Sequence, residues 1–385
     1  MKILIAVKNY WPSSGGVQSV TKYMAEGLVE KGHQVTILTR LEKETPIEDE
    51  KNGVRIFRIK QNSLFKFNFG DKHQFRSYIL EHSWDVVISV CAQSYSAEWM
   101  FPILDKIKAR KILYMHGMRG SSIDLSRIDS LKTFLKEFVL VNWWNRYFKR
   151  NWKYIKKFDA TVHLFPNDSS FSYFKMHGYK YNYAIANSCD SIFFEEKNKS
   201  EVLDKYGIHS PYFIQVANYD DRKNQLLALK AFLQADSGDS ELVFIGSSPN
   251  ASYNKVKKYL DLFGREKSGK VHLLTAVPRE DTIALVKGAY SVLLSSRHEY
   301  FPISIVEGMA AGKPFISTHV GEVPKFLGGH TCRTQSELAY WMEYYLTHPD
   351  YVQSLGKEAK KFALSNMLLQ DKINQLEDVC KGNIL

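Results

Sequence analysis

Short runs of apolar, β-branched residues alternate with helical patterns along the whole chain, and this alternation restricts the fold more than any other feature. A helix is predicted over Val17–Glu30, for example, where apolar residues recur at helical spacing and Gly32 ends the pattern. Strands that alternate with helices imply parallel sheets covered by helices on both faces. The strands are predicted at Ile3–Val7, Gln34–Thr39, Val54–Ile59, Val86–Val90, Lys111–Met115, Ala160–Leu164, Tyr183–Ala186, Tyr212–Val216, Leu242–Ile245, Val271–Leu274, Ser291–Ser295 and Pro314–Thr318. The sequence therefore predicts an α/β protein.

The length of 385 residues suits two domains of average size rather than one. The polar, charged stretch Asn187–Ser200 is the predicted join between two series of strands and helices. We predict an N-terminal domain over 1–190, a C-terminal domain over 191–365 and a final helix within 366–385. That helix covers about Leu368–Val379 and is followed by no strand.

Composition narrows the class of protein. The four cysteines lie far apart with no metal-ligand spacing, which is typical of reduced thiols in a cytosolic protein. No run reaches the roughly 20 apolar residues that span a bilayer, and the apolar run after Met1 lacks the cleavage site of a signal peptide. The formal charge of +11 indicates an anionic partner, which could be nucleic acid, membrane lipid or a phosphorylated substrate.

One segment, from Ser295 to Pro314, carries two carboxylates where a strand turns into a short helix. Pro302 is predicted at the first helical position, and the amides near Ile303 and Ser304 then form an anion site suited to a diphosphate. Glu299 precedes this site and Glu307 lies more than one turn inside the helix, so the two can hold different parts of one ligand. Two such carboxylates are common by chance, but their place after a strand favours a ligand site.

This segment resembles the E-x7-E signature of glycosyltransferase family 4, whose members are retaining enzymes with the GT-B fold. The resemblance continues through residues 308–314 and through Gly321 and Pro324. It implies two Rossmann-like domains that face each other across a cleft, with a C-terminal helix crossing back to the first domain. It also implies that Glu299 contacts the donor sugar and that Glu307 holds the ribose hydroxyls, with Phe301 among the donor-binding residues.

Two N-terminal segments take their interpretation from the same resemblance. Gly15 and Gly16 follow the first strand and open a helix, where backbone amides can approach a phosphate. A tight turn explains this glycine pair equally well, but the resemblance makes Gly16 a donor-phosphate contact. His116, just past a predicted strand, matches the active-site histidine of the family, whose backbone or ring faces the transferred sugar.

The segment after the strand Tyr212–Val216 resembles the place where an arginine and a lysine of the family meet the diphosphate. Lys223 matches the lysine, whereas Asn218 stands where the arginine is expected. The change removes charge-assisted contacts to phosphate. Arg222 is a candidate to supply the missing charge, although a solvated helix residue explains it equally well. Asn187-Ser-Cys-Asp190 resembles the turn that closes the first domain, and ordinary turn bonding is a sufficient explanation for it.

The stretch 131–157 interleaves basic residues with Trp, Tyr and Phe over helical spacing, with Glu137 as its one acid. Part of it must be core, but such a surface suits anionic headgroups, and we predict contact with a membrane. No recognition motif for nucleic acid accompanies it.

The resemblance implies a retaining glycosyltransferase that uses a nucleoside-diphosphate sugar, and the commonest nucleotide in the family is that of uridine. The expected acceptor is a lipid-linked sugar or a polysaccharide in bacterial surface-glycan assembly, on the cytoplasmic face of the membrane. No metal-ligand cluster is visible in the sequence, so we expect no cofactor and no metal dependence. The alternatives are a nucleotide-sugar epimerase of the same fold and a catalytically idle sugar-nucleotide-binding partner, which the change at Asn218 favours.

Overall fold

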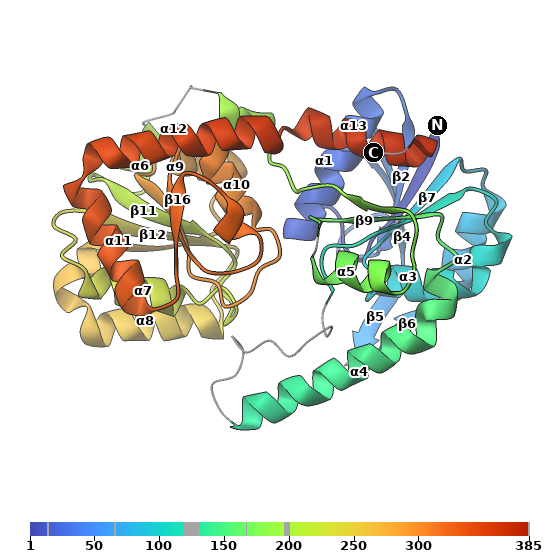
Figure 1. Ribbon diagram of the computed structural model, residues 1–385, viewed down its shortest axis with the longest axis horizontal. Coiled ribbons are helices and arrows are strands. Elements are labelled where there is room, and N and C mark those ends of the chain that lie inside the picture. Colours follow the sequence, from blue (N-terminus) through green and yellow to red (C-terminus); the bar gives the residue numbers. More distant parts are fainter. Residues whose placement is uncertain (14, 65–66, 119–130, 167, 196–200, 384–385) are drawn as a thin grey trace. The chain divides into compact units, whose positions relative to one another are not determined.

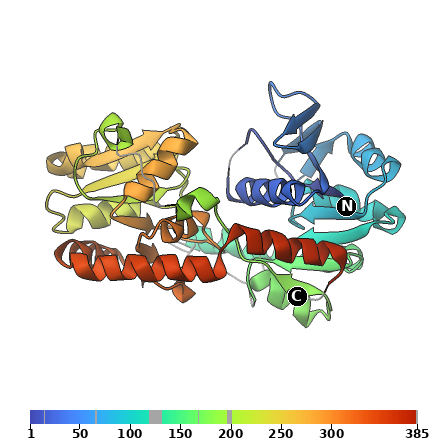
Figure 2. The same ribbon diagram turned by 90° about the horizontal axis from the view of Figure 1, so that it is seen from above.

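The computed structural model describes residues 1–13, 15–64, 67–118, 131–166, 168–195 and 201–383. They form two compact units, one made of residues 1–186 together with those from Leu369 onward, the other of Asn187–Leu368. Each unit has its own largely parallel sheet and its own hydrophobic core. Helices cover both faces of each sheet (Figures 1 and 2), and the predicted α/β class is confirmed.

The sheet of the first unit has eight strands in the order β10-β9-β8-β7-β1-β2-β4-β3. Neighbours are parallel except β3, which pairs antiparallel with β4. The parallel strands run outward from β1 in both directions, as in a doubly wound fold. The bounds are β1 (Lys2–Ala6), β2 (Gln34–Arg40), β3 (Glu48–Lys51), β4 (Val54–Ile59), β7 (Val86–Val90), β8 (Arg110–Tyr114), β9 (Ala160–His163) and β10 (Asn182–Ala184), with a separate hairpin of β5 (Gln61–Leu64) and β6 (Phe67–Gly70).

The helices of the first unit bury one apolar face each against this sheet. Phe75, Trp99 and Phe148, from three different helices, belong to one core cluster with strand residues such as Leu4 and Leu113. The helices are α1 (Gly16–Glu30), α2 (Lys72–Glu81), α3 (Tyr95–Met100), η1 (Phe101–Lys106), α4 (Leu131–Ile155), α5 (Ser169–Met176) and α13 (Leu369–Lys381).

The second unit repeats the architecture with six parallel strands in the order β13-β12-β11-β14-β15-β16. Its strands are β11 (Tyr212–Val216), β12 (Glu241–Gly246), β13 (Val271–Thr275), β14 (Ser291–Leu294), β15 (Phe315–Thr318) and β16 (Gly329–Cys332). Its helices are η3 (Ser191–Phe194), α6 (Glu201–Lys205), α7 (Gln225–Gln234), α8 (Ala251–Phe263), η4 (Arg265–Lys270), α9 (Arg279–Gly288), α10 (Ile303–Ala310), η5 (Val323–Lys325), α11 (Gln335–Thr347) and α12 (Pro349–Asn366).

Four short strands were not predicted, namely β3, β5, β6 and β16. The β3 strand consists of four charged residues on an exposed sheet edge and has no apolar pattern. A signal for it does exist in Asn52-Gly53, where both residues have positive φ, as a two-residue hairpin turn requires. The apolar pattern that identifies a core strand is weak at edges, where one side of the strand faces solvent.

The last helix, α13, packs against α1 within the first unit. Gly27 allows this close approach, because a Cβ there would lie 2.0 Å from the Ile373 side chain. At the end of the helix pair, the Glu377 carboxylate binds His33 Nε2 at 2.9 Å, Lys381 Nζ at 2.7 Å and Lys31. Hydrogen bonds from Lys31 and Lys381 lower the pKa of Glu377 to about 2.

Replacing Glu377 by Gln is expected to lower the free energy of unfolding of the first unit by about 1 kcal/mol at neutral pH, since it removes charge-assisted hydrogen bonds. A folded-state pKa of about 2 lies below the usual 4.5, so this stabilisation is present above pH 4.5 and is lost as the pH falls towards 2. Denaturant unfolding at several pH values measures it. The exposed Glu30→Gln serves as a control, and a constant difference down to pH 2 would contradict the assignment.

Candidate functional site

The candidate site residues of the second unit lie where the strand order reverses. β11 is central and its neighbours β12 and β14 lead away in opposite directions. Lys223 follows β11, and Glu299 with α10 follows β14, so these residues lie beyond the carboxyl ends of adjacent parallel strands. Ligands in open α/β sheets bind at this switch point. The topology therefore brings together segments that are some 75 residues apart in the chain, as the separation of 76 between Lys223 and Glu299 shows.

Lys223 and Glu299 form an ion pair, with Nζ at 2.6 Å from Oε1. The backbone around Lys223 is held by side chains of the sheet. Gln215 Nε2 donates to the Lys223 carbonyl at 3.0 Å, and Ser295 Oγ donates to the same carbonyl at 3.1 Å. The ion pair joins Lys223, which was predicted to bind the diphosphate, to Glu299, which was predicted to contact the donor sugar. Both side chains are partly buried, and there the attraction between the charges is stronger than in water.

The helix α10 begins at Ile303, with Pro302 as its N-cap residue rather than at the first helical position. The prediction was wrong by one residue because Pro302 has ψ of 118°, which is extended backbone. No side chain caps this end, and Ile303 and Ser304 are both partly exposed. Amides at such an end are suited to an anion.

Close packing fixes α10 against the sheet. A Cβ at Gly308 would lie 2.4 Å from the Val292 side chain on β14, so only glycine permits this approach. At the other end, Asn187 Nδ2 donates to the carbonyl of the buried Phe301 at 2.9 Å. The predicted turn at Asn187 thus positions the loop before α10, a role that the sequence did not indicate.

Glu307 is buried within α10, and its Oε1 lies 2.5 Å from Nη2 of Arg279. Burial raises the pKa of Glu307, and the Arg279 charge acts in the opposite direction. Arg279 begins α9, and its guanidinium lies 5.2 Å from the centre of the Phe193 ring. Sequence analysis missed Arg279. The sequence shows only a basic residue after Val277-Pro278, where a helix is expected to begin. That position indicates a partner of Glu307 only once the fold is known.

Asn218 and Arg222 are exposed, and the structure does not bring Arg222 to Lys223's carboxylate partner. The Arg222 guanidinium instead donates two hydrogen bonds to the Asp220 carboxylate. Nε lies 3.1 Å from Oδ1 and Nη2 lies 3.3 Å from Oδ2. Arg222 would have to leave Asp220 in order to contact a phosphate.

In the first unit, Gly15 is the N-cap residue of α1 and Gly16 its first residue, and α1 is the helix that follows β1 in the chain. His116 lies just beyond β8. Because β1, β7 and β8 are parallel, both positions lie at the carboxyl edge of this sheet. The His116 ring stacks on Tyr114 at 4.8 Å, and burial lowers the pKa of His116 to about 4. The imidazole is therefore neutral near pH 7 and suits a hydrogen bond rather than an ion pair.

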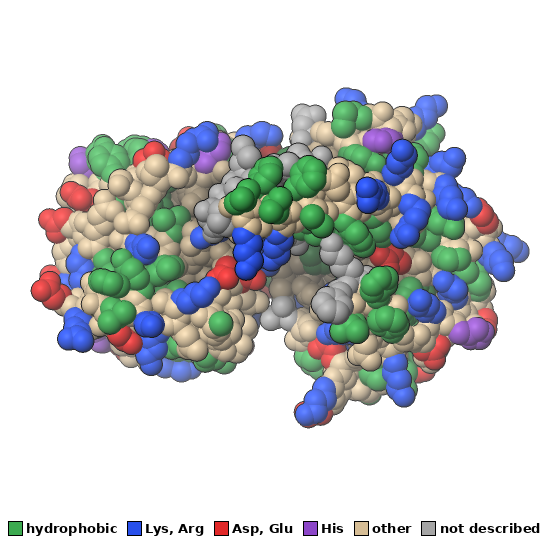
Figure 3. Space-filling view, turned by 90° about the horizontal axis from the view of Figure 1, so that it is seen from below, with side chains coloured by type: hydrophobic (Ala, Val, Ile, Leu, Met, Phe, Trp, Pro, Cys, Tyr) green, Lys and Arg blue, Asp and Glu red, His purple; other side chains and the backbone are tan. Residues whose placement is uncertain are grey.

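The helix α4 divides into two halves with different surroundings. Its C-terminal half belongs to the core, where Tyr147 and Phe148 are buried and Trp143, Trp144 and Trp152 pack against them. Its N-terminal half presents apolar side chains to solvent, with Leu131 74% and Val139 65% exposed, together with Phe134, Leu135 and Phe138. Figure 3 views the face that carries these hydrophobic side chains with lysines beside them. The exposed surface of α4 is thus built from Leu, Val and Phe. The tryptophans, which were predicted to contact a membrane, instead pack against the core.

Among the residues that the structure describes, no three His, Cys, Asp or Glu side chains form a group that could hold a metal ion. Within the same residues, no helix has the length and apolar character needed to cross a bilayer.

Comparison with known proteins divides the chain as the two units do. The family model described as Glycosyltransferase Family 4 matches residues 14–165, and the model described as Glycosyl transferases group 1 matches residues 198–362. A D-rhamnosyltransferase, WbpZ of Pseudomonas aeruginosa, is 31% identical over 99 residues. That match covers 23% of this chain and only 26% of the length of WbpZ.

Solved structures show the same fold. Anabaena Alr3699/HepE, in complex with UDP-glucose, matches with a TM-score of 0.74 and 15% identity over 99% of this chain and 100% of the other. WaaG, a glycosyltransferase involved in lipopolysaccharide biosynthesis, matches with a TM-score of 0.71 and 15% identity over 99% and 100% of the two chains. At such identities the likeness concerns the architecture.

Proposed function

Because this chain belongs to the glycosyltransferases of the family 4 type with the GT-B fold, we propose that it is a retaining enzyme that uses a UDP-sugar. It transfers a hexose or N-acetylhexosamine to a lipid-linked or polysaccharide acceptor in bacterial surface-glycan synthesis. The observation that carries the proposal is the pair of ionic contacts in one unit, Lys223 with Glu299 and Arg279 with Glu307, beside the uncapped start of α10. The UDP-glucose complex of HepE and the role of WaaG support the donor and the pathway class.

In this proposal the donor diphosphate lies on the amides near Ile303 and Ser304, with Lys223 beside it. The ribose hydroxyls bind Glu307, whose carboxylate Arg279 already orients. When the bond between the anomeric carbon and the phosphate oxygen breaks, negative charge grows on the diphosphate, and fixed donors stabilise it most there.

The acceptor hydroxyl attacks the anomeric carbon from the face that the diphosphate leaves, which retains the configuration. The new bond joins the acceptor oxygen to that carbon, and the acceptor proton passes to the departing phosphate oxygen. His116, neutral near pH 7, is assigned to a hydroxyl of the transferred sugar. The charge of the leaving group is assigned to Lys223 and the helix amides, so we propose a reaction that does not depend on a metal.

One experiment separates the proposal from its alternatives. The chain is incubated with UDP-hexoses and simple lipid-linked acceptors, with and without EDTA, and UDP and sugar products are measured. A transferase releases UDP and extends the acceptor with a retained anomeric configuration. An epimerase would give a UDP-sugar isomer of unchanged mass and no UDP, and an idle partner would give neither. Loss of UDP release in EDTA would contradict metal independence.

We further propose that the N-terminal half of α4 binds the anionic inner face of the cell membrane. Leu131, Leu135 and Phe138 recur at helical spacing, and Lys132 and Lys136 are exposed beside them. The β5–β6 hairpin adds the exposed Leu64 and Phe67. The hairpin is tied to the C-terminal half of α4 through α3, since Asn68 Nδ2 and the Tyr147 side chain each hydrogen-bond Glu98.

Replacing Leu135 and Phe138 by Glu is expected to weaken co-sedimentation with anionic vesicles at least tenfold, because burying each such side chain contributes roughly 1.5–3 kcal/mol. Leu262→Glu with Phe263→Glu is the matched control, since these side chains are similarly exposed on α8. Equal loss in both variants, or wild-type binding by the α4 variant, would contradict this contact.

A further inference from the structure

An open pocket with a volume of about 890 Å³ lies in the first unit, at the start of three neighbouring strands. We call it the basic pocket, and its walls include Arg110 at the start of β8, Asp159 just before β9 and Tyr181 just before β10. Gly16 and His116 lie beyond the carboxyl ends of strands in the same sheet. Because the strands are parallel, the basic pocket is on the opposite edge from those predicted site residues. It is therefore a separate place on the unit.

The charge of the basic pocket is strongly positive. Five cationic side chains line it, and Asp159 is the acid among the lining residues. Lys111 neutralises that acid, with Nζ at 3.0 Å from Oδ2, and its backbone N–H donates to the same oxygen at 2.7 Å. The cations that remain are Lys108, Arg110, Lys156 and Lys180.

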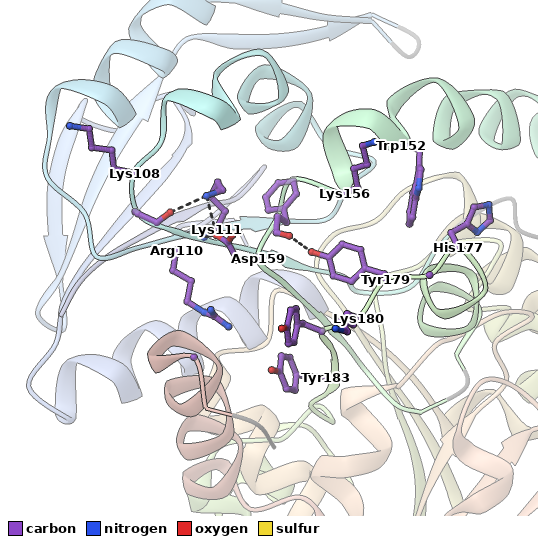
Figure 4. A pocket seen from close by; sticks show the side chains of 15 residues that line it. Lys108, Arg110, Lys111, Trp152, Lys156, Asp159, His177, Tyr179, Lys180 and Tyr183 are labelled. Atoms are coloured by element: carbon purple, nitrogen blue, oxygen red, sulfur yellow. Dashed lines mark hydrogen bonds and ion pairs between the residues drawn. The ribbon is translucent and has the colours of Figure 1, made fainter.

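These cations come from three segments, and Arg110, Lys156 and Lys180 lie on different sides of the hollow (Figure 4). Arg110 is held in place, because its Nε donates to the Val379 carbonyl of α13 at 2.8 Å. Lys156 follows the end of α4, and Lys180 precedes β10. Like charges that gather around one hollow repel each other, so an anion that binds between them gains from all of them.

Aromatic rings form a second part of the wall. Trp152 is half-buried, with the His177 ring at 5.0 Å, and Tyr181 is 49% exposed. The Tyr179 hydroxyl donates to the Phe158 carbonyl, which fixes that ring (Figure 4). Flat aromatic faces with a few fixed polar groups are typical of sites for ring-shaped ligands, and the volume lies in the range of small-molecule sites.

We infer that the basic pocket binds a phosphorylated sugar, with the phosphate on Arg110, Lys156 and Lys180 and the sugar ring on the aromatic wall. Guanidinium and ammonium groups are the usual protein partners of phosphate. A concave hollow of this size holds one or two rings, whereas a nucleic acid needs an extended basic strip. The inference does not depend on the transfer reaction.

Calorimetry with glucose 6-phosphate tests the inference, on the full chain in the presence of excess UDP. Binding is expected, and Lys156→Gln with Lys180→Gln should raise the Kd by at least about tenfold, or 1.4 kcal/mol. Lys153→Gln with Lys175→Gln is the matched control, since both lysines are exposed nearby but do not line the basic pocket. Tyr181→Ala should weaken binding of glucose 6-phosphate more than that of inorganic phosphate.

A phosphorylated sugar can be a soluble molecule or the headgroup of a lipid. A second binding experiment, with vesicles that contain phosphatidylinositol, distinguishes the two. Binding of glucose 6-phosphate alone indicates a soluble ligand, and binding of the vesicles by the same lysines indicates a lipid headgroup. No binding of either probe, or equal loss in the pocket and control variants, would overturn the inference. Equal affinity for inorganic phosphate and glucose 6-phosphate would overturn the sugar assignment, as would a preference for single-stranded RNA. If the protein bound glucose 6-phosphate in the basic pocket but released no UDP in the transfer assay, only the transferase proposal would be contradicted.

Discussion

Replacing Glu307 by Gln is expected to weaken UDP binding by about 10- to 100-fold, because a hydrogen bond to a charged group contributes about 1.5–3 kcal/mol. The glutamine keeps the shape of the buried side chain but removes the carboxylate that Arg279 holds at 2.5 Å. Calorimetry with UDP measures the effect. A nucleotide that lacks both ribose hydroxyls should bind the wild type weakly, and the variant, whose uncharged amide oxygen is a weaker acceptor, should distinguish it from UDP less than the wild type does.

Glu241→Gln is a matched control for this variant. Glu241 is also a buried glutamate of the second unit, and it accepts from the amides of His209 and Ser210 at 2.8 Å each. It lies at the start of β12, at the opposite edge of the sheet from Glu307. Its replacement should lower stability and leave the UDP affinity unchanged. Wild-type affinity in Glu307→Gln would remove the ribose role.

Replacing Lys223 by Gln is expected to lower kcat by about 10²- to 10³-fold, which is the usual effect of removing one donor that stabilises developing negative charge. The binding free energy of UDP should become less favourable by at least about 1 kcal/mol. Lys223 Nζ lies 2.6 Å from Glu299 in the structure, so a bound diphosphate must share this ammonium with Glu299. Steady-state kinetics of UDP release, with calorimetry of UDP, separate the effect on chemistry from that on binding.

The control for Lys223 is Lys255→Gln, because Lys255 is also ion-paired in the second unit, with Asp221 at 3.0 Å. Its loss should leave kcat close to that of the wild type, because an exposed ion pair contributes at most about 1 kcal/mol to stability and Lys255 has no assigned part in the reaction. If Lys223→Gln retained both kcat and UDP affinity, the diphosphate role would pass to another group. Arg222 would then be the first to examine, after its release from Asp220.

The strand pattern could be predicted wherever a strand is buried on both faces. β7 and β11, for example, have the predicted bounds, because short runs of mostly apolar residues identify such strands. The charged edge strand β3 and the strand β16, Gly-His-Thr-Cys, lack that pattern and were missed. In α4, periodicity identified the helix but not which half is core, since Trp and Phe suit both the core and an exposed patch.

The order of residues along the chain was sufficient to determine the fold class and the family, and it indicated Glu299, Glu307 and Lys223 as chemical groups. Hydrophobic periodicity is a local property, and a single segment shows it. The tertiary structure decided the partners. It paired Arg279 with Glu307, placed Asn187 on the Phe301 carbonyl, and gathered the lysines of the basic pocket from separate segments. These contacts join residues far apart in sequence, and no local pattern encodes which strands become neighbours in a sheet.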